Sequence, residues 1–266
     1  IRLGILGMGR IGQKIAKIAK SLGMIIHYHN RSKLSKEKED GAIYHDNLKD
    51  LLSVSDVLSV CCPASKETID MINKDTIEYL PKDVFSIADA KRGDIGNTSK
   101  LYARAFFEHM DFDSVTVSPY MGRDSIEPFL KYDDKYTILL GLTSNTGAND
   151  FQISDKSELD LFKSVLKKSQ NWINSKNLMY VIGATKSTYL KEVRSIIPNN
   201  FLLIPGVGAQ GGSLTETYTN GVNDDIGILV NSSRSIIYAG NDINFLEKSL
   251  KEAESVQNQM KILLND

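Results

Sequence analysis

Gly7-Met8-Gly9-Arg10-Ile11-Gly12 stands between a strand-like apolar run, Arg2–Leu6, and an amphipathic stretch, Ile11–Leu22. This glycine spacing between a strand and a helix is typical of a turn that holds a dinucleotide. The first glycine permits the turn, the second lets a pyrophosphate approach the backbone, and the third lets the helix pack on the strand. The amino end of the helix then favours the phosphate charge. The alternative is a glycine turn of an α/β unit that binds no ligand.

The end of the next apolar run indicates which dinucleotide suits this turn. After Met24–Tyr28 the chain continues as His29-Asn30-Arg31-Ser32. A site that prefers NAD carries Asp or Glu near this point, where the carboxylate holds the ribose 2′-hydroxyl. Asn30, Arg31 and Ser32 instead bring a cation and a hydroxyl, which suit a 2′-phosphate. The sequence therefore predicts NADP(H) over NAD as the cofactor of this segment.

Apolar runs of strand length alternate with amphipathic stretches along nearly the whole chain. The runs are rich in Val, Ile and Leu and lack a polar side, as expected of parallel strands buried on both faces. The predicted strands are Arg2–Leu6, Met24–Tyr28, Val57–Cys61, Val84–Ala88, Ser114–Ser118, Tyr136–Gly141, Met179–Gly183, Phe201–Pro205 and Ile226–Asn231. The predicted helices are Ile11–Leu22, Thr98–His109, Ser157–Ser175, Thr188–Ile197 and Asp242–Leu264. This alternation predicts a parallel α/β architecture with right-handed crossovers.

Composition excludes several classes of protein. The 266 residues include 32 Lys and Arg against 33 Asp and Glu, a formal net charge of −1, which argues against nucleic acid as a partner. No apolar run approaches the roughly 18 residues that span a bilayer, so no membrane partner is expected. The only cysteines, Cys61 and Cys62, are adjacent and indicate a reducing, cytoplasmic setting. Because the chain starts at Ile1 inside a strand-like run, we expect a cut or fused piece.

A charged cluster follows the run Val84–Ala88. It reads Asp89-Ala90-Lys91-Arg92-Gly93-Asp94. Asp89 and Lys91 are two residues apart at a strand end and are expected to point the same way, with Asp94 opening the next loop. Flanking carboxylates favour the charged form of an ammonium, and such a preorganised cluster suits a reaction that stabilises negative charge. The alternative is a set of surface ion pairs at the start of a helix.

Two glycine- and serine-rich stretches follow the last two predicted strands. The first is Pro205-Gly206-Val207-Gly208-Ala209-Gln210-Gly211-Gly212, and the second is Asn231-Ser232-Ser233-Arg234-Ser235. Backbone amides and an arginine after the final two strands match the phosphate site of many (βα)8 barrels. Arg234 supplies a fork for phosphate oxygens and Gln210 a neutral donor. The alternative is a pair of glycine turns beside a solvated arginine.

The first part of the chain, from Ile1 to about Asp83, resembles the nucleotide-binding domain of the D-2-hydroxyacid dehydrogenases of the glyoxylate and hydroxypyruvate reductase group. The resemblance rests on the glycine turn, on Asn30-Arg31-Ser32 and on Cys62-Pro63, a loop that borders the nicotinamide in that family. The family's catalytic Glu and its His in a Pro-His setting have no counterpart in the sequence. The resemblance therefore implies an NADP(H)-binding module without complete dehydrogenase activity.

The remainder of the chain, from about Val84 onward, resembles orotidine 5′-phosphate decarboxylase of the longer bacterial subgroup. The motifs that carry this resemblance are Asp89–Thr98, Ser118–Gly122, Leu142–Asn145, Gly183–Lys186, Pro205–Gly212 and Asn231–Ala239. The resemblance implies that Lys91 protonates the substrate carbon, that Asp89 crowds the substrate carboxylate and that Asp94 reaches across a homodimer interface. It also implies that the substrate is bound by Thr98, Ser144, Pro205, Gln210 and Arg234. The implied reaction needs no metal and no organic cofactor.

The two resemblances together predict a hybrid fold. Residues 1–83 form a partial Rossmann dinucleotide-binding segment, and residues 84–266 form a TIM-barrel segment that lacks the first two barrel strands and one lysine of the charged network. We expect a Rossmann-like lobe continuous with an incomplete or distorted TIM (βα)8-type barrel. Three functions stay open: decarboxylation of a small-molecule nucleotide, a nucleotide-binding module without catalysis, and a fusion with no function.

Overall fold

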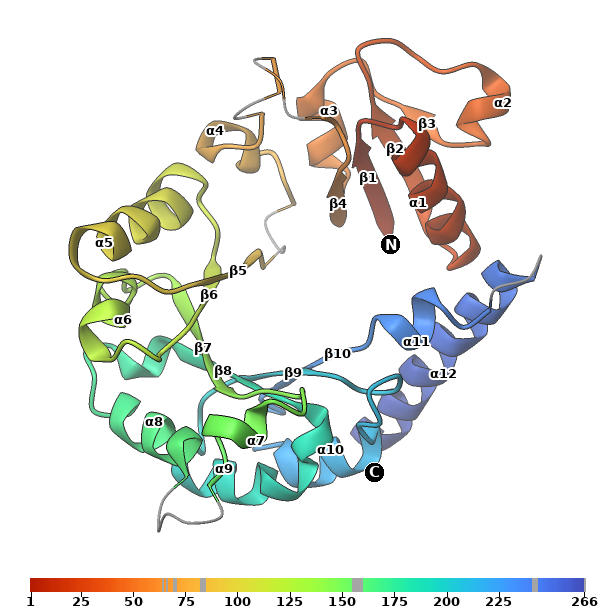
Figure 1. Cartoon of the computed structure of the whole chain (residues 1–266). Coiled ribbons are helices and arrows are strands. Elements are labelled where there is room, and N and C mark those ends of the chain that lie inside the picture. Colours follow the sequence, from red (N-terminus) through yellow and green to blue (C-terminus); the bar gives the residue numbers. More distant parts are fainter. Residues whose placement is uncertain are drawn as a thin grey trace. The chain divides into compact units, whose positions relative to one another are not determined.

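The computed structural model in Figure 1 describes residues 1–63, 65, 67–68, 71–81, 85–154, 160–240 and 244–265. Backbone contacts divide the chain into two compact units. The first comprises Ile1–Phe85, His109–Asp111 and Tyr238–Glu254, and the second comprises Ser86–Glu108, Phe112–Ile237 and Ser255–Asp266. The predicted domain boundary between residues 83 and 84 lies outside the described residues and stays a prediction.

The first unit contains a four-stranded parallel sheet in the order β3-β2-β1-β4. Its strands are β1 (Arg2–Leu6), β2 (Ile25–His29), β3 (Ile43–Tyr44) and β4 (Val57–Val60), and its helices are α1 (Arg10–Ser21), α2 (Lys36–Glu39), α3 (Leu48–Ser53) and α4 (Lys74–Ile77). The first strand therefore lies between the second and the fourth, which is the strand order of a doubly wound dinucleotide-binding fold. The predicted Rossmann-like topology is confirmed.

Apolar residues of β1, β2 and α1 form the core of this unit. Ile5 and Tyr28 are fully buried, and Ala16 and Ala19 of α1 pack on the same cluster. Alanine on the inner face of α1 lets the helix approach the sheet closely, and Gly12 continues that face. The third glycine of the turn thus contributes to packing, as its position predicts.

The second unit contains a six-stranded parallel sheet whose strands lie side by side in chain order, from β5 to β10. The strands are β5 (Ile87–Arg92), β6 (Ser114–Val117), β7 (Tyr136–Leu142), β8 (Leu178–Ile182), β9 (Leu202–Pro205) and β10 (Ile228–Asn231). Sequential neighbours are the arrangement of a (βα)8 barrel, and six strands supply part of one. The prediction of an incomplete barrel-type sheet is confirmed.

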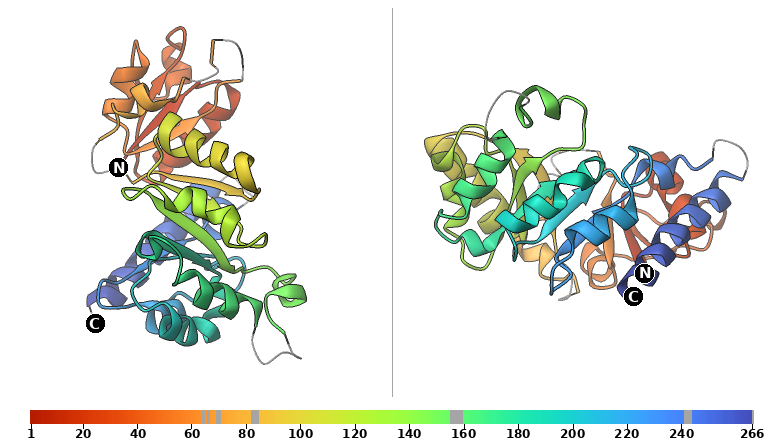
Figure 2. Two further views of the ribbon diagram at one scale, coloured as in Figure 1. Left: turned by 90° about the vertical axis from the view of Figure 1, so that its left-hand side faces the viewer. Right: turned by 90° about the horizontal axis from the view of Figure 1, so that it is seen from below.

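Figures 1 and 2 show α5, α6, α8, α9 and α10 along the convex face of this curled sheet. The helical elements after β5 are α5 (Gly96–Arg104), the π-helix η1 (Ala105–His109), α6 (Arg123–Leu130), α7 (Ala148–Phe151), α8 (Leu161–Ser169), η2 (Ser175–Asn177), η3 (Ala184–Tyr189), α9 (Leu190–Ile196), α10 (Leu214–Gly221), α11 (Arg234–Ile237) and α12 (Phe245–Asn265). Alternate strand residues such as Leu139 and Tyr180 join the helices in one large core. Their neighbours Ile138, Met179 and Val181 form a separate cluster, because successive strand side chains point to opposite faces.

Several predicted element boundaries differ from the structure. The strand predicted at Val84–Ala88 is β5, which extends to Arg92, so Asp89 and Lys91 lie inside the strand rather than after it. The helix predicted at Thr98–His109 is α5 followed by a π-helical turn. α8 is shorter than the predicted Ser157–Ser175, of which residues 157–159 lie outside the described residues.

Among the described residues, no helix has both the length and the apolar content needed to cross a bilayer.

Candidate active site

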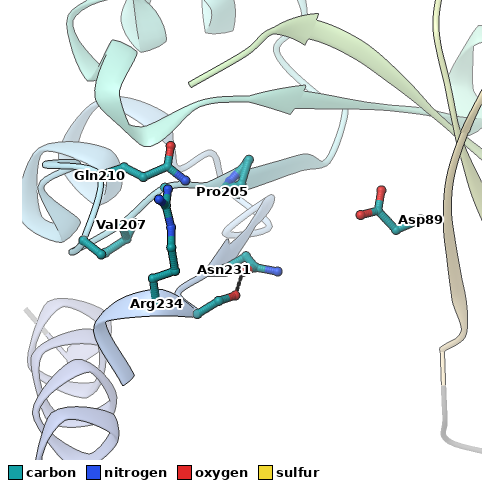
Figure 3. Close-up of a pocket in the computed structure, with 9 residues that line it drawn as sticks. Asp89, Pro205, Val207, Gln210, Asn231 and Arg234 are labelled. Atoms are coloured by element: carbon teal, nitrogen blue, oxygen red, sulfur yellow. Dashed lines mark hydrogen bonds between the residues drawn. The ribbon is translucent and has the colours of Figure 1, made fainter. Parts of the chain in front are cut away.

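A cavity of about 330 Å³ lies at the carboxyl ends of β5, β9 and β10 in the second unit (Figure 3). Its walls are formed by Asp89, Pro205, Gly206, Val207, Ala209, Gln210, Asn231, Ser233 and Arg234. In a parallel sheet these strand ends share one edge, so residues more than 100 positions apart in the sequence converge there. Figure 3 shows Asp89 facing Gln210 and Arg234 across the cavity.

Asp89 and Lys91 form an ion pair at this edge. The Lys91 ammonium donates to Asp89 Oδ1 at 2.5 Å, and the Thr116 hydroxyl donates to the same oxygen at 3.0 Å. Burial raises the pKa of Asp89, but the hydrogen bonds from Lys91 and Thr116 and the charge of Lys91 outweigh it, so the pKa lies below its ordinary value. Asp89 is therefore an anion at neutral pH, and the Lys91 ammonium is bound to its carboxylate.

The opposite wall is a glycine-rich turn between β9 and α10. Gly206 has φ +98°, a conformation that side chains rarely adopt, and Gly208, at φ +80°, would place a Cβ 2.8 Å from the Ser235 hydroxyl. Glycine at position 208 lets the turn lie against the start of α11, and glycine at position 206 leaves room for the side chains of Ser144 and Gln210. The Gln210 carboxamide accepts a hydrogen bond from the Ser144 hydroxyl at 2.9 Å, which links this turn to the loop after β7.

Arg234 begins α11 and projects toward Gln210 (Figure 3). No carboxylate of the described residues forms an ion pair with it, so its guanidinium is available to an anion. Beside it, the Ser233 hydroxyl donates to the side-chain carboxamide oxygen Oδ1 of Asn231 at 3.0 Å. The cavity therefore has an anion, Asp89, at one end, and a cation with amide and hydroxyl groups at the other, and the ammonium bound to Asp89 lies outside its lining. Such a site fits a ligand that carries a phosphate and a second, reacting group.

A second cavity, of about 710 Å³, lies in the first unit around the glycine turn. Its walls include Gly7, Met8, Gly9, Gln13, His29, Asn30, Arg31, Ser32, Lys38, Cys61, Cys62, Pro63, Glu67 and Thr68. A Cβ on Gly7 would lie 2.6 Å from the backbone nitrogen of Cys62, whereas a Cβ on Gly9 would meet no atom within 4 Å. The turn is thus packed against the β4 end at Gly7 and open at Gly9, which is the position expected to face a pyrophosphate.

Polar groups at the end of β2 line the other side of this cavity. The Asn30 carboxamide oxygen accepts from the Met8 backbone N–H at 2.6 Å and so fixes the glycine turn. Arg31 lies 3.4 Å from the Glu67 carboxylate, with exposed side-chain fractions of 92% and 73%. An ion pair between such exposed groups contributes little, so an anionic ligand group has ready access to Arg31.

Within the described residues, no group of three or more His, Cys, Asp or Glu side chains has the arrangement of a metal site.

Comparisons with known proteins address the family of the chain. A family model described as Orotidine 5'-phosphate decarboxylase / HUMPS family matches residues 60–248. The orotidine 5′-phosphate decarboxylase of Christiangramia forsetii is 60% identical over 190 residues, which make up 70% of this chain and 70% of that protein. The chain belongs to the orotidine 5′-phosphate decarboxylase / HUMPS family.

Solved structures of this family have the same fold. The orotidine 5′-phosphate decarboxylase of Leishmania donovani superposes with a TM-score of 0.58 at 25% identity and covers 96% of this chain and 93% of that chain. The UMP synthase of the same organism gives a TM-score of 0.62 at 25% identity, and this chain spans 53% of its length. The predicted resemblance to the decarboxylase family is confirmed.

A second family model matches the segment that contains the glycine turn. A family model for the D-isomer specific 2-hydroxyacid dehydrogenase, NAD binding domain, covers residues 1–112 and overlaps the decarboxylase match over residues 60–112. The predicted dehydrogenase resemblance of the first segment is confirmed as well. The chain thus matches family models of both kinds, over overlapping segments.

The structure brings together most of the residues predicted for the decarboxylase site. Asp89, Pro205, Gln210 and Arg234 line one cavity, while Lys91 joins it through Asp89 and Ser144 through Gln210. Asp94 and Thr98 do not line it. The Asp94 carboxylate accepts from the neighbouring Ile95 N–H, and Thr98 lies exposed in the first turn of α5. Their predicted roles require a second subunit and stay predictions.

The residues predicted to bind the dinucleotide also fall into two groups, those that line a cavity and those that do not. Gly7, Gly9, Asn30, Arg31, Ser32, Cys62 and Pro63 line the cavity of the first unit. Arg10, Ile11 and Gly12 lie in the first turn of α1 and are not part of its lining; Gly12 is buried against the sheet instead.

Sequence reasoning did not single out several residues of these cavities. In the cavity of the second unit they are Asn231 and Ser233, to which the motif Asn231–Ala239 gave no role of their own. The buried Thr116, which donates to Asp89 from outside the cavity lining, was not singled out either. A threonine within the Val-rich run Ser114–Ser118 was the available signal for Thr116. In the other cavity, Gln13 and Lys38 come from helices whose faces the glycine pattern does not specify.

Proposed function

We propose that the cavity at β5, β9 and β10 decarboxylates orotidine 5′-phosphate to uridine 5′-phosphate, a carboxy-lyase reaction of pyrimidine biosynthesis. The observation that carries the proposal is the placement of Asp89, which is ion-paired to Lys91, opposite Gln210 and Arg234 in one cavity. The relative from Christiangramia forsetii, which bears the name of this activity, supports it. The proposed reaction uses no metal and no organic cofactor.

In the proposed reaction Arg234 and Gln210 bind the 5′-phosphate, and Ser144 binds the pyrimidine edge. The bond between C6 and the carboxylate carbon breaks, its electron pair stays on C6, and the Lys91 ammonium transfers a proton to C6 as carbon dioxide leaves. The Asp89 carboxylate stands beside the substrate carboxylate and destabilises that charge in the bound state. Binding energy from the distant phosphate offsets this repulsion. Pro205 shapes the wall between the two ends.

The proposal extends to a homodimer, in which Asp94 of one subunit completes the charged network of the other and Thr98 lies nearby as a substrate-binding residue. Exposed apolar side chains support such an interface. Ile95 follows Asp94 and has an exposed fraction of 57%, and Tyr120 and Met121, in the segment after β6 that lies beside Gly93, have exposed fractions of 82% and 43%. Exposed apolar groups of this size favour burial against another surface.

Sedimentation or light scattering should give twice the chain mass for the native protein and the chain mass for Tyr120→Lys.

Formation of uridine 5′-phosphate from orotidine 5′-phosphate tests the activity directly. We expect turnover above the uncatalysed rate and its loss in Lys91→Met, which removes the proton donor. Lys131→Met is the matched control, because Lys131 is an exposed lysine at the end of α6 and outside the cavity. A native chain with no turnover, or equal rates in both variants, contradicts the proposal.

We propose a second function for the first unit, the binding of NADP(H). The residues present fit this group: Gly9 leaves open space beside the amino end of α1, and Arg31 and Ser32 stand at the end of β2 where a 2′-phosphate binds. When bound, the cofactor would supply hydride chemistry, for which the described residues offer no assigned proton donor.

The segments 1–83 and 84–266 are our proposed domains for the two functions, and the cytoplasm is their proposed location.

Fluorescence titration with NADPH tests this binding. We expect saturable binding, tighter for NADPH than for NADH, and loss of both in Gly9→Asp, which puts a carboxylate where the pyrophosphate approaches. Glu67→Gln is a matched control that removes a carboxylate from the same cavity and should tighten NADPH binding. Equal affinity for NADPH and NADH contradicts the assignment of Arg31 to the 2′-phosphate.

A further inference from the structure

β5 contains a bulge with a single residue opposite it. The pairs Ala88↔Val115 and Arg92↔Val117 flank an irregular stretch, so residues 89–91 of β5 face only Thr116 of β6. Lys91 has φ +47°, in the left-handed region that non-glycine residues rarely adopt. A bulge re-aims side chains and removes backbone groups from the regular ladder of hydrogen bonds.

The Thr116 side chain replaces the missing ladder contact. Its hydroxyl oxygen accepts the Lys91 backbone N–H at 2.9 Å and donates its own hydrogen to Asp89 Oδ1 at 3.0 Å. The other acceptor near this hydroxyl, the Ala88 carbonyl, is farther away at 3.5 Å. One hydroxyl group thus holds the backbone of the lysine and the carboxylate of the aspartate.

Thr116 is fully buried, whereas the side chains of Lys91 and Asp89 have exposed fractions of 54% and 62%. An ion pair between side chains that are half exposed to solvent is weak and does little to fix its own geometry. A buried, β-branched side chain has restricted rotation about χ1 and is held by its packed neighbours. The relative position of Asp89 and Lys91 is therefore fixed by the buried Thr116 hydroxyl rather than by their own ion pair.

We propose that Thr116 is a positioning residue that fixes the Asp89 carboxylate and the left-handed backbone of Lys91, so that the ammonium is held over the reacting carbon. This inference rests on the proposed decarboxylation and goes beyond it, because Thr116 itself does not line the cavity. The Thr116 hydroxyl acts before substrate binds, by preorganising the pair.

Two measurements on Thr116→Val, Thr116→Ala and Thr116→Ser test the proposal. The first is the pKa of Asp89 by carboxyl NMR titration, with the signal assigned through Asp89→Asn. We expect that pKa to rise when the hydroxyl is removed and to stay at the native value in Thr116→Ser. The second is the rate of uridine 5′-phosphate formation: kcat should fall roughly 10- to 100-fold in Thr116→Val and Thr116→Ala, as for loss of a hydrogen bond to a charged group, with little change in KM.

Thr217→Val is the matched control, because Thr217 is also fully buried but its hydroxyl has no hydrogen-bond partner among the described residues. Thr217→Val should change neither the pKa of Asp89 nor kcat. Thr116→Ala serves where valine at this position prevents folding. A native Asp89 pKa in Thr116→Val or Thr116→Ala overturns the proposal. Absence of turnover in the unmodified chain counts against decarboxylation alone, since the titration still decides the role of Thr116.

Discussion

Gly7 and Gly9 belong to one turn but have opposite surroundings. Gly7 has φ +93°, and a Cβ there would meet the Cys62 backbone nitrogen at 2.6 Å. Gly9 precedes α1 with φ −78°, and a Cβ there has no neighbour within 4 Å. At the scale of single residues, the first glycine thus stabilises the turn and the second leaves room for a ligand.

We expect Gly7→Ala to lower the free energy of unfolding of the first unit by about 1–3 kcal/mol, because the side chain is strained at positive φ and collides with backbone. Gly9→Ala should change it by less than about 0.5 kcal/mol, the usual range for a surface position, while weakening NADPH binding. Urea denaturation followed by circular dichroism gives the stabilities. Equal losses of stability in the two variants would show that the contact with Cys62 is unimportant.

Two neighbouring elements of the first unit are joined by a histidine pair. His27 of β2 and His45, just after β3, approach within 2.8 Å between Nδ1 and Nε2. This hydrogen bond needs one ring nitrogen without a proton, so it is lost when both rings are protonated. Burial lowers the pKa of His27, and the charges of His45 and Arg2 lower it further against the opposing effect of Asp56. Burial also lowers the pKa of His45, which Asp50 and Asp46 oppose and His29 reinforces.

The stability of the first unit should therefore depend on pH below neutrality. Both histidine pKa values lie below the unfolded value of about 6.5, so the unfolded chain binds more protons in this range. Stability is complete above pH 6.5 and falls as the pH drops through the folded pKa values, by at most about 1.4 kcal/mol per pH unit for each histidine. Urea denaturation between pH 5 and 7 measures this slope. His27→Gln should reduce it, and an unchanged slope would mean that other groups cause it.

At the scale of elements, the sequence predicted most strands but not β3 or the bulge of β5. β3 has two residues, Ile43 and Tyr44, and so offers too little apolar pattern for recognition. Its place comes from pairing with β2, a tertiary contact. The left-handed backbone of Lys91 has no sequence signal, because lysine rarely adopts it. The spacing of Asp89 and Lys91 predicted that they point the same way, whereas the means by which they do so was visible only in the structure.

At the scale of the whole molecule, the described residues form two parallel sheets of different strand order and two main apolar cores. One core includes Ile5, Ile26 and Tyr28, and the other includes Leu139, Tyr180 and Leu202. The sequence predicted both orders, since each family supplies its own. It predicted the residues of the two cavities through motifs that follow strand ends. It gave no roles to Asn231 and Ser233, which the fold brings into the cavity.

Because each unit has its own core, we expect calorimetry to show two unfolding transitions. NADPH should raise the temperature of one and uridine 5′-phosphate that of the other. A ligand at 100 times its dissociation constant stabilises the unit that binds it by about 2.7 kcal/mol. A single transition that both ligands shift would contradict this expectation and would indicate one cooperative unit.

The strand order of the six-stranded sheet has a consequence for biosynthesis. From β6 to β10, each strand pairs with the strand made just before it, so every new strand leaves the ribosome after its template. In the four-stranded sheet, β4 instead pairs with β1, on the side of β1 away from β2, after β2 and β3 have been made. Nearby partners close short loops and form quickly. The second sheet is therefore suited to vectorial growth during translation, whereas the first is completed only when its last strand has been synthesised.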